Sequence, residues 1–170
     1  MARWKTLLAI AALFVIGAPL AAVHAGSQGW SRHRDPGVGF RFFYPSQLFA
    51  PIPGDGKPYF HYFVSPDDTA KFLVGAWNNG KRQTPESLKR WLMANAGGYE
   101  DVTYRPRGRN WFVLSGYRGD RIYYEKVIFS CGGAVVNVFA IAYPVEAREL
   151  YDPVVERMED DFRPGTGCAQ

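Results

Sequence analysis

The chain has 170 residues, with 20 Lys plus Arg against 16 Asp plus Glu, and two cysteines. Hydrophobic residues make up 47% and aromatic residues 16% of the chain. This is enough to bury a core, so a chain that is disordered over its whole length is excluded. The length fits one domain with short appendages. After residue 25 no stretch is long and apolar enough to span a membrane.

The first 25 residues have the pattern of a cleavable secretory signal peptide. Arg3 and Lys5 give a positive start, an apolar run extends over 7–16, and small residues up to Ala25 suit a signal peptidase. The alternative is an uncleaved membrane anchor, which is less favoured because the apolar run is short and ends at Gly17. We therefore expect a periplasmic or secreted protein, and no lipid anchor, since no cysteine lies near the cut.

Cleavage changes the charge of the chain. Losing Arg3 and Lys5 from the 20 basic residues leaves 18 against 16 acidic ones, a net charge of +2. Nucleic-acid binding depends on a strongly basic surface. We therefore expect no nucleic-acid partner for the exported chain.

Cys131 and Cys168 are the only cysteines. In an oxidising compartment two cysteines most simply form one disulfide. Closing a loop of about 37 residues would contribute ~4 kcal/mol in the chain-entropy model. The alternatives are two free thiols or a metal site, which the wide spacing and the lack of an adjacent histidine disfavour.

Residues 26–37 are polar and predict a flexible lead-in, followed by a single domain over 38–170. Residues 47–57 contain two prolines and two glycines and predict a loop. The aromatic and β-branched segments that predict strands are, in chain order, 38–44, 59–64, 71–77, 102–105, 111–117, 121–130 and 134–143. The last four are joined by short turns, which predicts an antiparallel meander and leaves no room for the crossover helices of a parallel sheet.

Two segments predict helices. Thr84-Pro85-Glu86 supplies a cap, a proline for the first helical position and an acid for the first turn, and Gly97-Gly98 marks the end. A second helix is predicted where apolar residues recur on one face, with Asp152 as the cap, Pro153 in the first position and a turn or short helix over 144–150. The apolar residues of that face are Tyr151, Val154, Val155, Met158 and Phe162.

The segment 121–143 is apolar on both faces of its strands, so both faces need cover. Alternate residues place Ile122, Tyr124 and Ile128 on one face, and Tyr123, Val127 and Phe129 on the other. The predicted fold class is α+β: an antiparallel meander sheet of about six or seven strands flanked by helices, in an α/β/α sandwich.

Three strings carry a resemblance to a known group: FRFFYPSQLF, VTYRPRGRNWFVLSGYRGDRIYYEKVIF and the terminal YDPVVERMEDDFRP. Over roughly 38–164 the chain resembles small exported bacterial proteins of unknown function with the PsbP-like α/β/α sandwich. That fold is named for an extrinsic subunit of photosystem II and is shared by a small Ran-release factor and some bacterial periplasmic lipoproteins. The resemblance implies binding or assembly and brings no catalytic residue set. Unlike the lipoproteins, this chain has no lipid-bearing cysteine.

Candidate catalytic and metal-ligating residues are few. His33 and His61 are the only histidines after the predicted cut, and neither has a second ligand at metal spacing, so we predict no metal site. No phosphate-loop motif is present, and we predict no cofactor. Ser115 lies in a predicted strand without the GxSxG context of a nucleophile. A pair of carboxylates that meet only in space stays open.

Five arginines are opposed only by Asp120 over 105–121: Arg105, Arg107, Arg109, Arg118 and Arg121. One interpretation is an anion-binding or partner-binding patch at one end of the sheet. The other is charge cover that pairs with the acidic segment 146–161, with alternate hairpin turns separating the arginines.

Aromatic residues either pack the sheet or line a groove for a sugar or peptide. Those considered are Tyr59, Tyr62, Trp77, Trp91, Trp111, Tyr117, Tyr123 and Tyr124.

The leading hypothesis is an exported, non-catalytic accessory or binding protein of the cell envelope, whose partner is another envelope protein or polymer. The alternatives are an envelope hydrolase acting on a glycan or ester, and an anion-binding module that uses the arginines.

Overall fold

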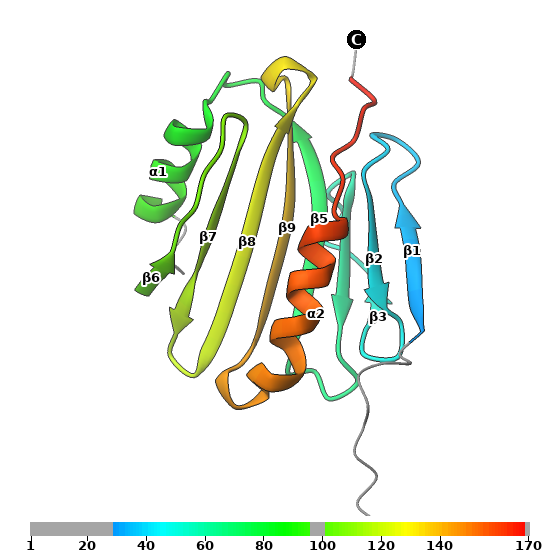
Figure 1. The fold of residues 1–170 in the computed structure, drawn as a ribbon. Helices are drawn as coiled ribbons and strands as arrows, with labels where there is room; N and C mark the ends of the chain where they lie inside the picture. The colour runs from blue at the N-terminus through cyan, green and yellow to red at the C-terminus, as the bar shows by residue number, and fades with distance from the viewer. Residues whose placement is uncertain (1–28, 96–100, 169–170) are drawn as a thin grey trace, which may run out of the picture.

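The computed structural model describes residues 29–95 and 101–168, and its main element is one large antiparallel sheet (Figure 1). The predicted signal peptide and the helix stop at Gly97-Gly98 lie outside the described residues. The strand order is β3-β4-β5-β9-β8-β7-β6, so β6 to β9 form the predicted meander and β5 adds beside β9. The strands are β3 (Ala50–Ile52), β4 (Phe60–Val64), β5 (Lys71–Asn78), β6 (Asp101–Tyr104), β7 (Trp111–Arg118), β8 (Arg121–Ser130) and β9 (Val135–Pro144).

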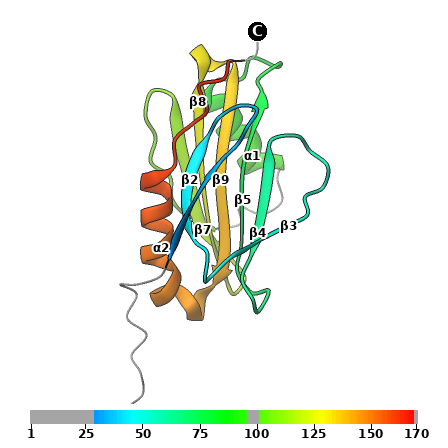
Figure 2. The same ribbon diagram turned by 90° about the vertical axis from the view of Figure 1, so that its right-hand side faces the viewer.

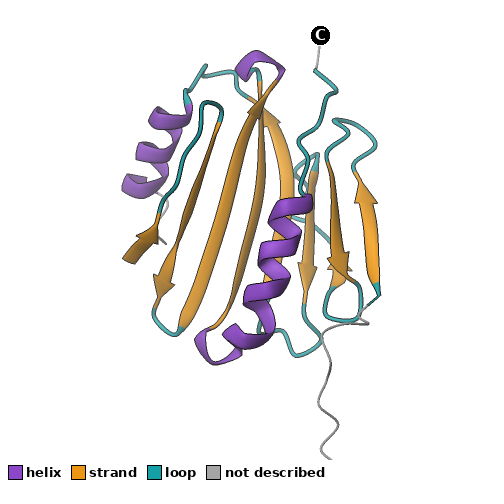
Figure 3. Ribbon diagram, viewed as in Figure 1, coloured by secondary structure: helices purple, strands orange, loops and turns teal. Residues whose placement is uncertain are grey.

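Both faces of the sheet are covered, but unequally. One face carries the helix α2 (Arg148–Asp161) and a hairpin of β1 (Trp30–Arg34) and β2 (Arg41–Pro45), and the other carries the helix α1 (Pro85–Asn95). Figure 2 shows α2 and the hairpin on one side of the sheet and α1 on the opposite side. Figure 3 separates the helices from the strands and turns. Two short 3-10 helices, Cys131–Gly133 and Val145–Ala147, flank β9. The predicted α+β sandwich is confirmed.

The alternation predicted along β8 is confirmed by two separate cores. Ile122, Tyr124 and Ile128 pack on the α2 side, with aromatic residues of β2, β5 and β9. On the α1 side Val127 and Phe129 are buried together with Leu88 of α1, while Tyr123 packs at the edge of this cluster. The α2 side is the larger core and includes Phe40, Phe42, Phe49, Phe63, Phe72, Phe139 and Phe162.

The prediction of a flexible lead-in over 26–37 is wrong for part of that segment. Residues Trp30–Arg34 form strand β1, which pairs antiparallel with β2 from Trp30↔Pro45 to Arg34↔Arg41. Its polar sequence, WSRHR, gives little strand signal, and the pairing with the aromatic strand β2 decides its conformation. The expected loop over 47–57 also contains the short edge strand β3.

The predicted start of the second helix is wrong. The helix α2 begins at Arg148, and Pro153 lies inside it. Asp152 does not cap the helix: its carboxylate accepts a hydrogen bond from the Tyr143 hydroxyl of β9 at 2.8 Å.

The C-terminal segment after α2 runs back along the hairpin. Arg163 exchanges two backbone hydrogen bonds with Arg41, at 2.9 and 3.0 Å. Gly165 passes so close that a Cβ there would lie 2.1 Å from the Val38 carbonyl oxygen, so the contact requires glycine. The segment ends in the disulfide between Cys168 and Cys131, which confirms the predicted pairing. Among the described residues, no helix is both long and apolar enough to cross a membrane.

Candidate functional site

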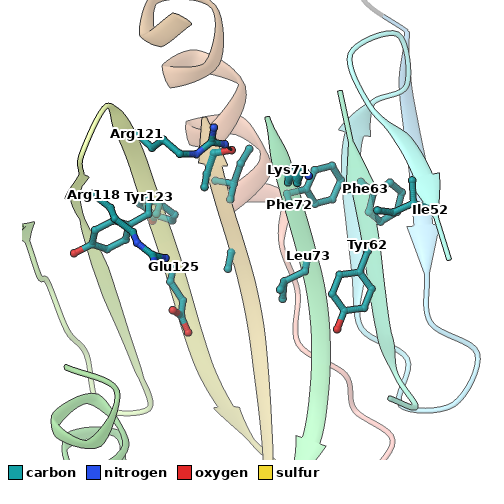
Figure 4. Close-up of a pocket in the computed structure, with 14 residues that line it drawn as sticks. Ile52, Tyr62, Phe63, Lys71, Phe72, Leu73, Arg118, Arg121, Tyr123 and Glu125 are labelled. Carbon is teal, nitrogen blue, oxygen red and sulfur yellow. Dashed lines mark hydrogen bonds between the residues drawn. The ribbon is translucent and has the colours of Figure 1, made fainter. Parts of the chain in front are cut away.

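The α1 side of the sheet has a groove where α1 does not reach. The groove has a volume of about 470 Å³ and is formed by strands β3, β4, β5, β7, β8 and β9. We call it the sheet-face groove, and Figure 4 shows the side chains that line it. The lining residues are Ile52, Tyr62, Phe63, Lys71, Phe72, Leu73, Arg118, Arg121, Tyr123, Tyr124, Glu125, Ala140, Ile141 and Ala142. Of these, Phe63, Phe72, Tyr124 and Ile141 pack in the core on the α2 side of the sheet.

The floor of the groove is made by small residues on the central strand β9. Ala140 pairs in register with Leu73 of β5 on one side and with Glu125 of β8 on the other. Ala142, two residues on, pairs with Lys71 and Tyr123. Because residues two apart on a strand share a face, the two alanines leave a shallow trough along β9.

Larger side chains form the walls of the groove. Figure 4 shows Tyr62 on one side and Tyr123, Glu125 and Arg118 on the other, with Leu73 of β5 beside the floor between them. The Tyr62 hydroxyl donates to Asp55 Oδ1 at 3.0 Å, which fixes the ring. Burial, followed by the hydrogen bond to Asp55 and then by its negative charge, raises the pKa of Tyr62. Burial also raises the pKa of Tyr123, so both rings stay uncharged phenols at neutral pH.

One end of the groove is basic, and we call Lys71, Arg118 and Arg121 its basic end. Arg118 and Arg121 face each other in register across the β7–β8 turn. The Arg121 guanidinium donates to the Thr69 and Ala142 carbonyl oxygens at 2.6 and 3.2 Å, which holds it against the floor. Lys71 forms an exposed ion pair with Asp68 at 3.0 Å. Arg118 is exposed at the turn.

The five predicted arginines do not form one patch. Arg118 and Arg121 lie at the end of β7 that joins β8, whereas Arg105, Arg107 and Arg109 precede the other end. The eight residues of β7 separate the two groups by roughly 25 Å. Arg107 is paired with Glu86 of α1 at 2.8 Å, so part of this set is charge cover.

A second cleft lies at that opposite end, between the loop after β5 and the turn after β8. Its volume is about 1150 Å³, and Arg82 and Arg109 contribute to its lining. One of its polar side chains is satisfied within the protein: Asn79 Nδ2 donates to the Gln83 and Gly133 carbonyl oxygens at 2.8 Å each. The sheet-face groove, with its partly exposed apolar floor, is the stronger candidate for a binding surface.

The hydroxyl of Ser115 is engaged elsewhere. Its Oγ donates to the Tyr123 carbonyl oxygen at 2.7 Å. Ser115 is on β7 and His61 is on β4. Three strands lie between these two, which separates the two residues by roughly 19 Å. The structure therefore does not bring Ser115 and a described histidine together.

The two histidines instead lie close to a buried carboxylate, that of Asp35, which directly follows β1 in the β1–β2 hairpin. His61 Nε2 lies 2.9 Å from Asp35 Oδ2, and the His33 ring centroid is 4.4 Å from that of His61. Asp35 also accepts backbone hydrogen bonds from Gly37 and Val38. Burial opposes ionisation of Asp35, but these hydrogen bonds outweigh it and lower its pKa.

Burial lowers the pKa of His33, and the neighbouring His61 lowers it further. Within residues 29–95 and 101–168, no three ligand-type side chains are placed to hold a metal ion. The contacts of His61 of β4 with Asp35 and His33 connect the β1–β2 hairpin to the large sheet.

Sequence patterns identified part of the groove. Tyr62 and Tyr123 stood among the aromatic residues considered for a groove, and Arg118 and Arg121 among the arginines. Ala140, Ala142 and Leu73 were missed because alanine and leucine in a strand are typical of a core. Only the strand register shows that α1 leaves them partly exposed.

No protein-family model and no curated protein sequence matches the chain. Among solved structures, the cyanobacterial PsbP (CyanoP) of Synechocystis sp. PCC 6803 matches with a TM-score of 0.59 and 14% identity, over 86% of this chain and 99% of that one. The Saccharomyces cerevisiae Ran-binding protein Mog1p matches with a TM-score of 0.58 and 9% identity, over 81% of this chain and 96% of that one. At these identities the likeness establishes the fold, which is the PsbP-like sandwich of the sequence resemblance.

Proposed function

We propose that this chain, which has the PsbP-like fold, is a non-catalytic binding protein of the cell envelope that receives its partner in the sheet-face groove. The observation that carries the proposal is the partly exposed apolar floor of Leu73, Ala140 and Ala142 on a face that α1 covers only in part. Exposed apolar surface of this kind marks interaction sites. Among the described residues that line the groove, Glu125 is the one acidic side chain, so these residues supply no carboxylate pair for glycoside hydrolysis.

A protein is the favoured partner. The fold neighbour Mog1p is described as a Ran-binding protein, and a similar sheet scaffold therefore serves protein recognition in at least that case. Export is supported by the signal-peptide pattern of the first 25 residues and by the Cys131–Cys168 disulfide, a bond typical of oxidising compartments.

The hydrolase alternative has less support. Ser115 is bonded to a backbone carbonyl, and the described histidines lie several strands away. The anion-binding alternative loses the predicted five-arginine patch, since Arg107 and Arg109 are separated from Arg118 and Arg121 by the length of β7.

Site-specific photocrosslinking in the producing cells tests the proposal. A photoreactive residue at Leu73, on the groove floor, is expected to crosslink one envelope protein, and Ala140→Arg in the same chain should abolish the product by filling the groove. The control position is Leu150, which is exposed on α2 on the opposite face. Equal products at both positions, or none at Leu73, would contradict the proposal, as would mutation-sensitive turnover of an ester or glycan.

A further inference from the structure

We propose that the occupant of the sheet-face groove is an amphipathic helix of the partner protein, lying along β9 with an acidic C-terminal end against Lys71, Arg118 and Arg121. This inference rests on the proposed function and adds the conformation, the direction and the charge of the bound segment.

The strands beneath the groove are spaced widely enough for a helix to lie over β9. The wall strands β4 and β8 are three strand spacings apart, or roughly 14 Å between their backbones. A helix with its side chains is about 10–12 Å across. From Ala140 to the row of Arg121 and Pro144 the groove extends roughly 14 Å along β9, which is about two and a half helical turns.

Backbone hydrogen bonding also favours a helix. On the face of a sheet the strand N–H and C=O groups are already paired in the plane of the sheet. An extended peptide on this apolar floor would leave its own backbone groups without partners, whereas a helix satisfies them internally. The groove floor continues the surface on which α1 already packs: Ala140 and Leu73 border the cluster that includes Leu88 of α1.

The open shape of the groove argues against a lipid chain. Small-molecule sites bury most of their ligand, commonly 70–90% of its surface. An acyl chain in a trough this wide would keep much of its surface in water. A helix needs to bury only one apolar stripe and can leave its polar face exposed.

The charges at the basic end give the helix a direction. The C-terminus of a helix carries a partial negative charge, which cations stabilise. Lys71, Arg118 and Arg121 lie at one end of the groove. Lys71 is already paired with Asp68, and Arg121 is held by the Thr69 and Ala142 carbonyl oxygens, so the exposed Arg118 is the cation that a partner reaches most easily. Acidic side chains or a terminal carboxylate in the last turn of the partner helix would therefore meet this end.

Two synthetic helical peptides of about four turns test the inference against the mature chain, residues 26–170. Both carry the same Ala/Leu stripe, and one has three Glu in its last turn where the other has three Lys. Fluorescence anisotropy at low salt is expected to show the Glu-ended peptide binding at least about tenfold more tightly. Arg118→Glu should abolish or reverse the preference, and Arg109→Glu, an exposed arginine at the far end of β7, should leave it unchanged.

A second pair of variants tests the floor. Ala140→Leu should weaken binding of the Glu-ended peptide at least about tenfold, and Ala134→Leu, at the exposed turn after β8, should not. Equal affinity for the two peptides, no binding of either, or dodecyl phosphate binding in their place would overturn the inference. If crosslinking from Leu73 still identifies one envelope protein, the proposed function stands and only the helix is wrong. If that crosslink is absent, the proposed function itself fails.

Discussion

At the scale of single residues, the cluster of His33, Asp35 and His61 has consequences for stability. Asp35 is 2% exposed and accepts hydrogen bonds from one imidazole and two backbone amides. The His33 Nε2 atom is buried and has no hydrogen-bond partner among the described residues. A proton on His33 would therefore add a charge to a buried site beside His61, and the attraction of the Asp35 carboxylate offsets this cost only in part.

We predict that His33→Gln reduces the loss of stability on mild acidification. The pKa of His33 is lowered by burial and then by His61, so below about pH 6.5 the unfolded chain binds a proton that the folded chain excludes. Wild-type stability should fall as the pH drops from 7 to 5, with a contribution from His33 of at most about 1.4 kcal/mol per pH unit. Urea unfolding at several pH values measures the slope.

The control for this prediction is Arg32→Gln, an exposed position on the same strand, which should keep the wild-type slope. Asp35 acts at lower pH: its pKa is lowered, so its stabilisation is lost as the pH falls below about 4 in wild type and variant alike. An unchanged slope for His33→Gln between pH 7 and 5 would show that the buried imidazole is not responsible.

At the scale of elements, the two helices show what a local sequence signal can and cannot determine. The Thr84-Pro85-Glu86 pattern correctly predicts the start of α1, where the Thr84 hydroxyl accepts a hydrogen bond from the Ser87 amide at 3.1 Å. Asp152-Pro153 has the same pattern but lies inside α2. The difference is tertiary, because Tyr143 and Arg148 bind the Asp152 carboxylate that would otherwise cap a helix.

We predict that Pro153→Ala stabilises the protein. A proline inside a helix removes one backbone hydrogen bond and crowds the preceding turn, which costs up to about 3 kcal/mol relative to alanine. The smaller entropy of an unfolded chain that contains proline offsets part of this, so the expected gain in unfolding free energy is about 1–2 kcal/mol. Denaturant unfolding measures it, and Glu156→Ala, exposed on the same helix, should change stability by less than about 0.5 kcal/mol. A loss of stability in Pro153→Ala would show that α2 depends on its proline.

Strand predictions succeeded where pairing partners are close in sequence. The segment 121–130 is a strand with the predicted bounds, since short turns join it to β7 and β9. Strand β1 was missed because its five residues have few strand formers and become regular only through β2. The floor of the groove was missed for the same reason. It depends on how β5, β9 and β8 pair with one another, and this pairing cannot be predicted from the sequence of any one strand.

At the scale of the whole molecule, the disulfide closes the C-terminal segment onto the sheet. Cys131 follows β8 and Cys168 lies 37 residues later, so the bridge encloses β9, α2 and the segment that crosses the hairpin. Asn137 of β9 holds the same segment, accepting a hydrogen bond from the Gly165 amide at 3.0 Å. Both contacts stabilise the end of the chain against the α2 side.

We predict that replacing both cysteines by serine lowers the unfolding free energy by about 2–4 kcal/mol, because the unfolded chain regains the entropy of an open loop. Urea unfolding of the double variant should match that of the reduced wild type. Binding of the Glu-ended peptide should be unchanged, since the groove lies toward the β7–β8 turn and the bridge toward the β8–β9 turn. Two free thiols in oxidised wild-type protein would contradict the prediction.

The placement of the bridge also decides how the protein is best attached to a surface. Arg121, in the basic end of the groove, is the first residue of β8, and Cys131 directly follows the last. The two residues are therefore separated by the length of the strand, roughly 33 Å. A tether joined beyond Cys168 would therefore hold the molecule by its far end, with the trough turned toward the bulk solvent. Immobilising it through the β7–β8 turn would hide the very side chains under test.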